Sequence, residues 1–428
     1  MGKILNFEKL AVTTLRKKAL AIAEAGFDAI DTKRVVEQNV RLSGNSLLIK
    51  NEVVNLDKTR RIRLVGFGKC AIDAAKTLES ILGHRLSGGI ILDVRDGQLK
   101  KVEVIHGDHP LPTERNADAT KKIIEFLKDS NEDDLIIFIV SGGGTTLLCQ
   151  PDKMTCQEEA DIVRCLFSAG ASIEKMNILR KHLSYARGGF LAKYAYPAKT
   201  VALIFSDVPG DNLNLIASGA TIKDTSTIED AKKIIAEFKL NETCGFKEDN
   251  LIETPKEEKY FENSKNIILV SNEVALRAMA EKARELGLKA TIRDAHLAGE
   301  AIAVGRDIVE KLAHSPKKTA FLYGGETAVT KIGKGKGGRN LELALSALRF
   351  IKPEQIIVTI ASDGQDNSDF AGGICDIITR EKATSAGLVF QKYLGDNESY
   401  AFFEKTGQYL KTGHTGSNVS DLIIAINQ

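Results

Sequence analysis

The stretch Leu135-Ile-Ile-Phe-Ile-Val-Ser-Gly-Gly-Gly-Thr-Thr146 is an apolar run that ends in three glycines and three hydroxyl side chains. A short, continuous apolar run is typical of a parallel strand that is buried on both faces. Gly142, Gly143 and Gly144 have no Cβ atoms, so their amide groups can approach an anion closely. Ligands of open parallel sheets bind at the carboxyl ends of the strands. The stretch therefore predicts an α/β fold with an anion site, most often for phosphate, although an ordinary strand-to-helix turn has the same composition.

The composition of the whole chain fits an ordinary globular protein. It has 428 residues, 43% hydrophobic and 27% charged, and this length predicts two domains. A net charge of +2 gives no reason to expect nucleic acid or a membrane surface as a partner. The apolar runs are shorter than the ~20 residues that span a bilayer, and the amino terminus has no signal pattern, so we expect a cytoplasmic protein. The six cysteines form no Cys-x-x-Cys pair, which predicts reduced thiols rather than disulfides or a zinc site.

Strand-like and helix-like segments alternate along most of the chain, which predicts parallel sheets built from βαβ units. We expect a Rossmann-like N-terminal domain over residues 1–245 and a smaller α/β domain over residues 246–428. The opening helices, within residues 1–45, are free to pack on the other domain. Residues 239–265 are polar and weakly periodic, so they are expected to form a linker or a surface excursion. A strand is expected over residues 327–332.

The stretch Val65-Gly-Phe-Gly-Lys69 follows a predicted strand and opens a predicted helix. It contains Gly66 and Gly68 of a dinucleotide-binding fingerprint, but Ile72 stands where the third glycine would be. A lysine at a helix start is unfavourable unless an anion meets it, because the helix dipole is positive there. This favours a phosphate-positioning or catalytic Lys69 over a solvated lysine.

Charged side chains gather in two further places. Arg180 and Arg187 lie at helical spacing on one face, where guanidinium groups suit a carboxylate or a phosphate. An ordinary basic helix face would have the same pattern. Asp207 and Asp363 each follow a predicted strand, where a carboxylate could hold Mg²⁺ or orient a hydroxyl. Both also fit ordinary loop chemistry.

The second half of the chain has its own glycine-rich segments. Tyr323-Gly-Gly-Glu-Thr327 repeats the pattern of a strand end with glycines, and Gly333-Lys-Gly-Lys-Gly-Gly-Arg-Asn340 follows it. The second segment has the composition of a flexible, positively charged lid that wraps a polyphosphate and brings an arginine to it. A solvated basic hairpin is the alternative.

Together these segments resemble the class II glycerate kinases, a family whose C-terminal half is named the MOFRL domain. The resemblance runs from about residue 60 to the end, with mild departures at Phe67, Cys70 and Thr145. The matching stretches are Gly66–Lys69, Gly107–Pro110, Ser141–Gly144, Asn177–Gly189, Ser206–Ser218, Tyr323–Asn340, Ser362–Asp366 and Thr412–Asp421.

The resemblance implies ATP- and Mg²⁺-dependent phosphorylation of D-glycerate, usually to 2-phosphoglycerate. It implies an active site in a cleft between the two domains, with Lys69 and Arg339 as catalytic residues, and it allows a homodimer. We expect the substrate to contact Ser141, Gly142, Gly143, Gly144, Arg180 and Arg187, and Mg²⁺ to contact Asp207 and Asp363. The expected nucleotide-binding residues are Gly66, Gly68, Gly324, Gly325, Glu326, Thr327, Lys334, Lys336, Gly337 and Asn340.

Two other functions fit parts of the sequence. An NAD(P)-dependent hydroxypyruvate reductase would use Gly66-Phe-Gly68 as its cofactor loop, with Asp93 at a plausible distance for the ribose. A metabolite-sensing module without enzymatic activity would use the same glycine loops. Against the reductase stand the missing third glycine and the lysine directly after the loop. Against the sensing module, the many loops with cations, carboxylates and hydroxyls favour a catalyst, because simple binding needs fewer polar groups.

Overall fold

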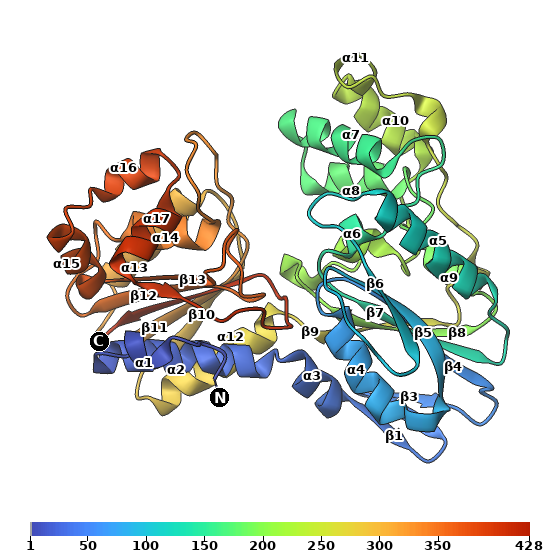
Figure 1. Cartoon of the computed structure of the whole chain (residues 1–428), viewed down its shortest axis with the longest axis horizontal. Helices are drawn as coiled ribbons and strands as arrows, with labels where there is room; N and C mark the ends of the chain where they lie inside the picture. The colour runs from blue at the N-terminus through green and yellow to red at the C-terminus, as the bar shows by residue number, and fades with distance from the viewer. Residues whose placement is uncertain (1) are drawn as a thin grey trace. The chain divides into compact units, whose positions relative to one another are not determined.

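The computed structural model describes residues 2–428, and the chain divides into two compact units. Unit 1 combines the residues up to Arg34, Asp207–Gly210 and Val270–Gln428, and unit 2 combines Val35–Ser206 and Asp211–Leu269. Each unit is built around its own six-stranded sheet (Figure 1). No helix among residues 2–428 has the length and apolar composition needed to cross a bilayer.

The sheet of unit 2 has the strand order β6-β5-β4-β7-β8-β9, and the pairs β5–β6, β4–β5, β4–β7 and β7–β8 are parallel. This order confirms the expected Rossmann-like sheet. The chain builds outward in both directions from the pair β4–β7, which is therefore the switch point where such sheets bind ligands. The strands are β4 (Arg61–Phe67), β5 (Leu86–Asp93), β6 (Val102–His106), β7 (Asp134–Val140), β8 (Lys199–Phe205) and β9 (Ser264–Val270).

Helices cover this sheet, and a separate group of helices has its own core. The long apolar run in β7 is explained by burial, because all of its residues are buried. Figure 1 shows α7, α8, α10 and α11 gathered away from the sheet, around buried residues that include Leu166, Leu179 and Ile235. A small antiparallel sheet adds β1 (Val40–Ser43), β2 (Ser46–Ile49) and β3 (Glu52–Asn55). The helices are α3 (Thr32–Asn39), α4 (Ala71–Leu82), α5 (Glu114–Lys128), α6 (Gly144–Leu147), α7 (Cys156–Ser168), α8 (Ile173–Lys181), α9 (Phe190–Ala195), α10 (Ile228–Glu237) and α11 (Leu240–Thr243).

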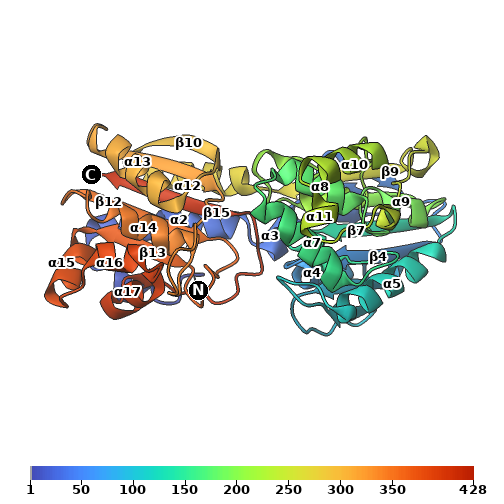
Figure 2. The ribbon, with the colours of Figure 1, turned by 90° about the horizontal axis from the view of Figure 1, so that it is seen from above.

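Unit 1 is a mixed sheet between two layers of helices. The strand order is β10-β11-β15-β12-β13-β14, with β10–β11 parallel and the other neighbours antiparallel. Figure 2 shows this sheet from above, with β15 and β12 near its middle. The strands are β10 (Lys289–Leu297), β11 (Thr319–Gly325), β12 (Gln355–Ala361), β13 (Gly372–Asp376), β14 (Tyr409–Leu410) and β15 (Asp421–Asn427).

The opening helices of the chain pack on the sheet of unit 1, together with α12 (Figure 1). Gly26 of α2 approaches the side chains of Met279 and Leu422. On the other face, α13, α14 and α17 share a core with Ile357 and Ile423. The helices are α1 (Phe7–Leu10), α2 (Thr14–Ala29), α12 (Asn272–Glu285), α13 (Ala301–Ala313), α14 (Arg339–Ala347), α15 (Ile377–Ser385), α16 (Phe390–Gly395) and α17 (Ser399–Thr406).

Several boundaries differ from the sequence-based expectations. The second half of the chain enters unit 1 at Val270, whereas the expected domain boundary lies after residue 245. Residues 239–265 are not a linker, because Leu240 and Phe246 are buried in the core that α7, α8, α10 and α11 share. Residues 327–332 form no strand, and only an isolated bridge joins Ala328 to Glu300.

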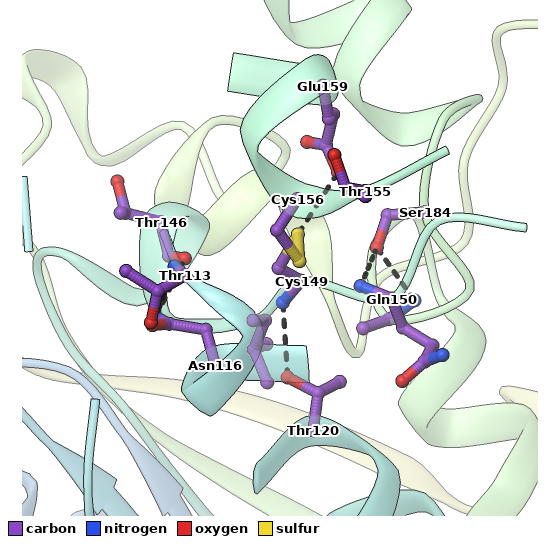
Figure 3. Close-up of a disulfide and its surroundings, with 12 residues drawn as sticks. Thr113, Asn116, Thr120, Thr146, Cys149, Gln150, Thr155, Cys156, Glu159 and Ser184 are labelled. Carbon is purple, nitrogen blue, oxygen red and sulfur yellow. Dashed lines mark hydrogen bonds between the residues drawn. A yellow bond between two sulfur atoms is a disulfide. The ribbon is translucent and has the colours of Figure 1, made fainter. Parts of the chain in front are cut away.

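The expectation of reduced cysteines is wrong for four of the six. Disulfides join Cys149 to Cys156 and Cys165 to Cys244, and both involve residues of α7. Figure 3 shows the first of them beside Thr120, Ser184 and Glu159. The spacing along the chain hides the second pair, because the packing of α7 against α11 brings Cys165 and Cys244 together across 79 positions.

We expect the oxidised protein, once unfolded, to react with two equivalents of a thiol reagent such as Ellman's reagent, from Cys70 and Cys375. Both thiols are buried in the fold, so the native protein should react slowly. Reduction before unfolding should raise the count to six. Six reactive thiols without any reductant would contradict the two disulfides.

Candidate active site

The carboxyl ends of β4 and β7 meet at the switch point of unit 2. Phe67 and Val140, the last residues of the two strands, are partners in the sheet. The backbone continues this contact, because the amide of Ser141 donates to the carbonyl of Phe67 (3.1 Å) and the amide of Lys69 donates to the carbonyl of Gly142 (2.9 Å). The turn that carries Lys69 is therefore fixed to the glycine loop, which we define as Ser141–Gly144.

Gly68 makes this close approach achievable. Its φ is +116°, and a Cβ atom there would lie 2.1 Å from the Oγ of Ser141. The Ser141 hydroxyl is buried and donates to the carbonyl of Phe67 (3.3 Å), while it accepts from the amide of Cys70 (3.4 Å). Gly66 lies inside β4 against Ile91. Gly66, Gly68 and Ser141, three expected ligand-binding residues, thus serve the packing of the strand ends.

Two side chains flank Gly143 in the glycine loop. An added Cβ atom at Gly143 would lie 3.4 Å from Cγ of Lys69 and 3.4 Å from the ring of His109. Lys69 lies just before α4 begins at Ala71. The structure therefore brings the expected Lys69 to the expected glycine loop, and it adds His109. His109 lies in the matching stretch Gly107–Pro110, and no sequence pattern predicts a role for it.

A strained turn supports the glycine loop from the other side. Ala217 and Ser218 have φ values of 47° and 51°, a left-handed conformation that costs energy for residues other than glycine. A Cβ atom at Gly144 would lie 2.8 Å from that of Ala217, and the hydroxyls of Ser218 and Thr145 are 3.3 Å apart. Sequence reasoning missed this support, because neither residue type signals a left-handed turn.

Arg187 ties three segments together. Its guanidinium forms an ion pair with Glu159 of α7 and donates to the carbonyls of Thr145 (2.8 Å) and Leu148 (2.9 Å). It also donates to the carbonyl of Arg180 (3.3 Å). Only 2% of Arg187 and 3% of Glu159 are exposed. Burial raises the pKa of Glu159, and the positive charge of Arg187 opposes that rise. Arg187 is thus mainly a structural tie between the glycine loop region and α7.

Arg180 lies beside this tie but has a different environment. It is half-buried at the end of α8, and within residues 2–428 its guanidinium has no hydrogen bond and no carboxylate within 4.0 Å. Burial and the neighbouring charge of Arg187 lower the pKa of Arg180 to about 10, so the side chain stays charged at neutral pH. Arg180, Arg187, Thr145 and Thr146 line a cavity of about 160 Å³.

Unit 1 holds the second expected catalytic residue, Arg339, at the start of α14. Its guanidinium donates two hydrogen bonds to Asp421 and pairs with Glu326 at 2.7 Å. Asp421 opens β15 and is the sheet partner of both Gly325 and Ala361. Burial alone would lower the pKa of Arg339, but the charges of Asp421 and Glu326 outweigh it and raise that pKa. Arg339 is therefore a permanently charged group held in a fixed orientation.

A buried carboxylate fixes the start of α14. Asp366 accepts hydrogen bonds from the amides of Asn340 (3.1 Å) and Leu341 (2.8 Å). Burial and the nearby charge of Asp421 raise the pKa of Asp366 to about 7. Asn340 is itself buried and lies 3.4 Å from Asp366 through its side chain. Its side-chain amide is therefore within hydrogen-bond distance of a protein carboxylate.

The lysine loop, residues 331–337, differs from the expected flexible lid. The amides of Ile332 and Gly333 donate to the side chain of Asn397 (2.7 and 2.8 Å). The amide of Gly335 donates to the carbonyl of Asp396 (2.9 Å), and the amine of Lys336 lies 4.0 Å from the ring centre of Tyr400. The loop is thus attached along its length to the segment between α16 and α17 and to the first turn of α17.

The lysine loop also borders a cavity of about 520 Å³, which Lys331, Lys334, Lys336, Gly337 and Glu342 line. The expected residues Lys334, Lys336 and Gly337 therefore share one cationic cavity in unit 1. By contrast, Gly324, Gly325 and Thr327 are buried, and Cβ atoms at the two glycines would contact Asn272 and Leu297.

The two carboxylates expected to hold Mg²⁺ both belong to unit 1. Asp207 accepts a hydrogen bond from the side chain of Asn418 (3.2 Å), and Asp363 accepts one from the amide of Gln365 (3.1 Å). Among residues 2–428, no three His, Cys, Asp or Glu side chains are grouped so that they could hold a metal ion. A magnesium ion that binds with a nucleotide needs only one or two protein carboxylates, since phosphate oxygens and waters complete its shell.

Comparison with known proteins places these sites in one family. Residues 18–247 match the family described as Domain of unknown function (DUF4147), and residues 319–421 match the MOFRL family. The D-glycerate 2-kinase of Thermotoga maritima is 35% identical, over 96% of this chain and 98% of the relative. A putative hydroxypyruvate reductase of Agrobacterium vitis is 32% identical, over 91% of this chain and 92% of the relative. The crystal structure of glycerate kinase from Thermotoga maritima superposes with a TM-score of 0.83 at 33% identity, covering 96% of this chain and 99% of that one.

We predict that Arg187→Met destabilises unit 2 by about 3–5 kcal/mol, because it leaves the buried Glu159 carboxylate without its partner. Urea unfolding followed by circular dichroism would measure the change. Arg164→Met is the matched control, since Arg164 is 54% exposed and pairs with Asp161 on the surface. That change should cost no more than about 1 kcal/mol. Equal losses in the two variants would contradict the structural role of Arg187.

We predict that the stability of the Asp366→Asn variant increases relative to that of the wild type as the pH rises. The folded pKa of Asp366 is about 7 and its ordinary value is 3.8, so the contribution of the carboxyl group to stability is complete below pH 3.8 and is lost as the pH rises through about 7. Asparagine does not ionise, and its single side-chain oxygen can accept from only one of the two amides, so it loses one hydrogen bond at every pH. The difference in Tm between variant and wild type should grow between pH 5 and pH 8. A constant difference, like that expected for Asp396→Asn at an exposed site, would contradict the raised pKa.

Proposed function

The chain belongs to the glycerate 2-kinase family that carries a MOFRL domain, and on this basis we propose that it transfers a phosphoryl group from ATP to D-glycerate, giving 2-phosphoglycerate and ADP. In this reaction the bond between the γ-phosphorus and its bridging oxygen breaks. A bond from the 2-hydroxyl oxygen of glycerate to that phosphorus forms, and the hydroxyl proton is released.

The observation that carries the proposal is the position of Lys69 at the switch point of the unit 2 sheet. The glycine loop holds the backbone of Lys69, and the side chain begins alongside Gly143. Phosphoryl transfer needs positioning and charge neutralisation more than covalent help. We propose that the Lys69 ammonium stabilises the negative charge that develops on the transferred group.

We propose that Arg339 also acts in phosphoryl transfer. Asp421 and Glu326 orient its guanidinium, so little conformational entropy is lost when an anion binds to it. The cationic cavity beside the lysine loop is the proposed site of the nucleotide phosphates, through Lys334 and Lys336. These assignments support a division of labour in which unit 2 supplies Lys69 and unit 1 supplies Arg339.

We propose ATP as the phosphoryl donor and Mg²⁺ as the metal, bound through the nucleotide and through Asp207 or Asp363. The metal would neutralise charge on the phosphates. The sequence also leads us to propose a cytoplasmic enzyme, alone or as a homodimer, without a nucleic-acid partner. The two disulfides argue against a cytosolic location in most organisms, because disulfides are rare in the cytosol outside the hyperthermophiles.

A hydroxypyruvate reductase is the weaker candidate for this fold. The β4 turn lacks the third glycine of a dinucleotide site, with Ile72 in its place. The space beside Gly68 is filled by Ser141, and Asp93 is fully buried, with its carboxylate accepting from the amide of Ile72 (3.0 Å). The carboxylate of Asp93 is therefore already hydrogen-bonded within the protein.

We predict that Lys69→Ala and Arg339→Ala each lower kcat for ADP formation from D-glycerate, ATP and Mg²⁺ by at least about 100-fold, as expected when a charge that stabilises the transition state is removed. A coupled assay for ADP would measure the loss. Lys76→Ala and Arg349→Ala remove exposed charges from the same units and should keep activity within about twofold. Hydroxypyruvate-dependent oxidation of NADH without ADP formation in the wild type would refute the kinase.

A further inference from the structure

The cavity beside the glycine loop contains one arginine that forms no ion pair within residues 2–428. Arg187 is neutralised by Glu159, and Arg164 on the rim is neutralised by Asp161. Arg180 makes no ion pair within 4.0 Å among residues 2–428, and the charge of Glu159, which already pairs with Arg187, acts on Arg180 only from a greater distance. A half-buried guanidinium without a direct ion pair is costly unless a ligand supplies the negative charge.

Two further donors at the cavity also lack partners. The Nε of Arg187 is buried and has no hydrogen-bond acceptor in the described part of the chain. The hydroxyl of Thr146 likewise makes no hydrogen bond within residues 2–428. Buried donors are nearly always satisfied, so the missing partner of the Arg187 Nε indicates water or a ligand, whereas the half-buried Thr146 hydroxyl is also open to solvent. Both side chains line the same cavity as Arg180.

We infer that this cavity is the subsite for the carboxylate of the acceptor substrate, with Arg180 as the residue that binds it. The inference rests on the proposed function and deepens it. A carboxylate carries one negative charge and two oxygens, which match the single free charge of Arg180 and the fork of its guanidinium. A phosphate dianion would bring more negative charge than the cavity can balance.

The assignment separates the two arginines that the sequence could not distinguish. Arg180 binds the substrate, whereas Arg187 positions the cavity wall by holding the carbonyls of Thr145 and Leu148 against α7. The same wall is fixed by disulfides at Cys156 and Cys165, near the two ends of α7. In glycerate the 2-hydroxyl is on the carbon next to the carboxylate. Holding the carboxylate therefore restricts where that hydroxyl can lie.

The test is steady-state kinetics of Arg180→Gln. We expect its KM for D-glycerate to rise about 10- to 100-fold, which corresponds to the loss of charged hydrogen bonds, and its KM for ATP to stay within twofold. Glyceramide, the neutral amide of the substrate, separates binding from a structural effect. The wild type should prefer D-glycerate over glyceramide, expressed as a ratio of kcat/KM values. In Arg180→Gln this preference should be smaller by the same factor. Arg180→Lys, which keeps the charge but loses the fork, should give an intermediate KM.

Arg41→Gln is the matched control, because it removes an exposed arginine of unit 2 that does not line the cavity. Its KM for D-glycerate should stay within twofold. If Arg180→Gln binds D-glycerate as tightly as the wild type by calorimetry, or weakens both substrates equally, the carboxylate subsite is refuted while the kinase stands. If the wild type itself forms no ADP with D-glycerate, the proposed function fails first. Thermal melting of each variant identifies any that does not fold, and Arg180→Lys then supplies the decisive comparison.

Discussion

The close contact between the ends of β4 and β7 is the constraint on which the site of unit 2 depends. These two strands are the switch point of the sheet, and beyond them the chain must leave in opposite directions. At Gly68 the two backbones come so near that a single Cβ atom would overlap the Ser141 hydroxyl. This contact fixes both the Lys69 turn and the glycine loop. The glycines thus matter because they let two strand ends approach, and the charge that acts on a ligand comes from the side chains nearby.

A second constraint extends the site outward from this junction. Burying the Arg187–Glu159 pair is expensive, but it joins the segment after the glycine loop to α7. Because Arg187 forms an ion pair with Glu159 inside the protein, Arg180 is the arginine that is available to bind an anionic ligand. Unit 1 also contains an arginine that is paired with carboxylates. Asp421 and Glu326 orient the guanidinium of Arg339 at the start of α14.

Local patterns in the sequence were sufficient for the framework. The apolar run of β7 and the Gly-x-Gly-Lys turn after β4 predict a Rossmann-like sheet with Lys69 at its carboxyl edge, because strand burial and turn glycines are short-range properties. The pairing of Arg339 with Asp421 could not be predicted in this way, since the two residues are 82 positions apart and meet only through the antiparallel pairing of β15.

The features that the sequence does not reveal share that physical origin. The lysine loop has the composition of a flexible lid, yet the single side chain of Asn397, 65 positions further along the chain than Ile332, attaches it. The disulfide of Cys165 and Cys244 depends on the packing of α7 against α11. The left-handed turn at Ala217 and Ser218 has no glycine to announce it. In each case a tertiary contact outweighs what the local residue types favour.

A crystal structure of the protein with bound D-glycerate would test the account of unit 2 most directly. The account predicts the carboxylate within hydrogen-bond distance of the Arg180 guanidinium, at about 2.7–3.2 Å, with the rest of the molecule directed toward the glycine loop. Density for D-glycerate in the lysine-lined cavity of unit 1, with the Arg180 cavity filled by water alone, would contradict it.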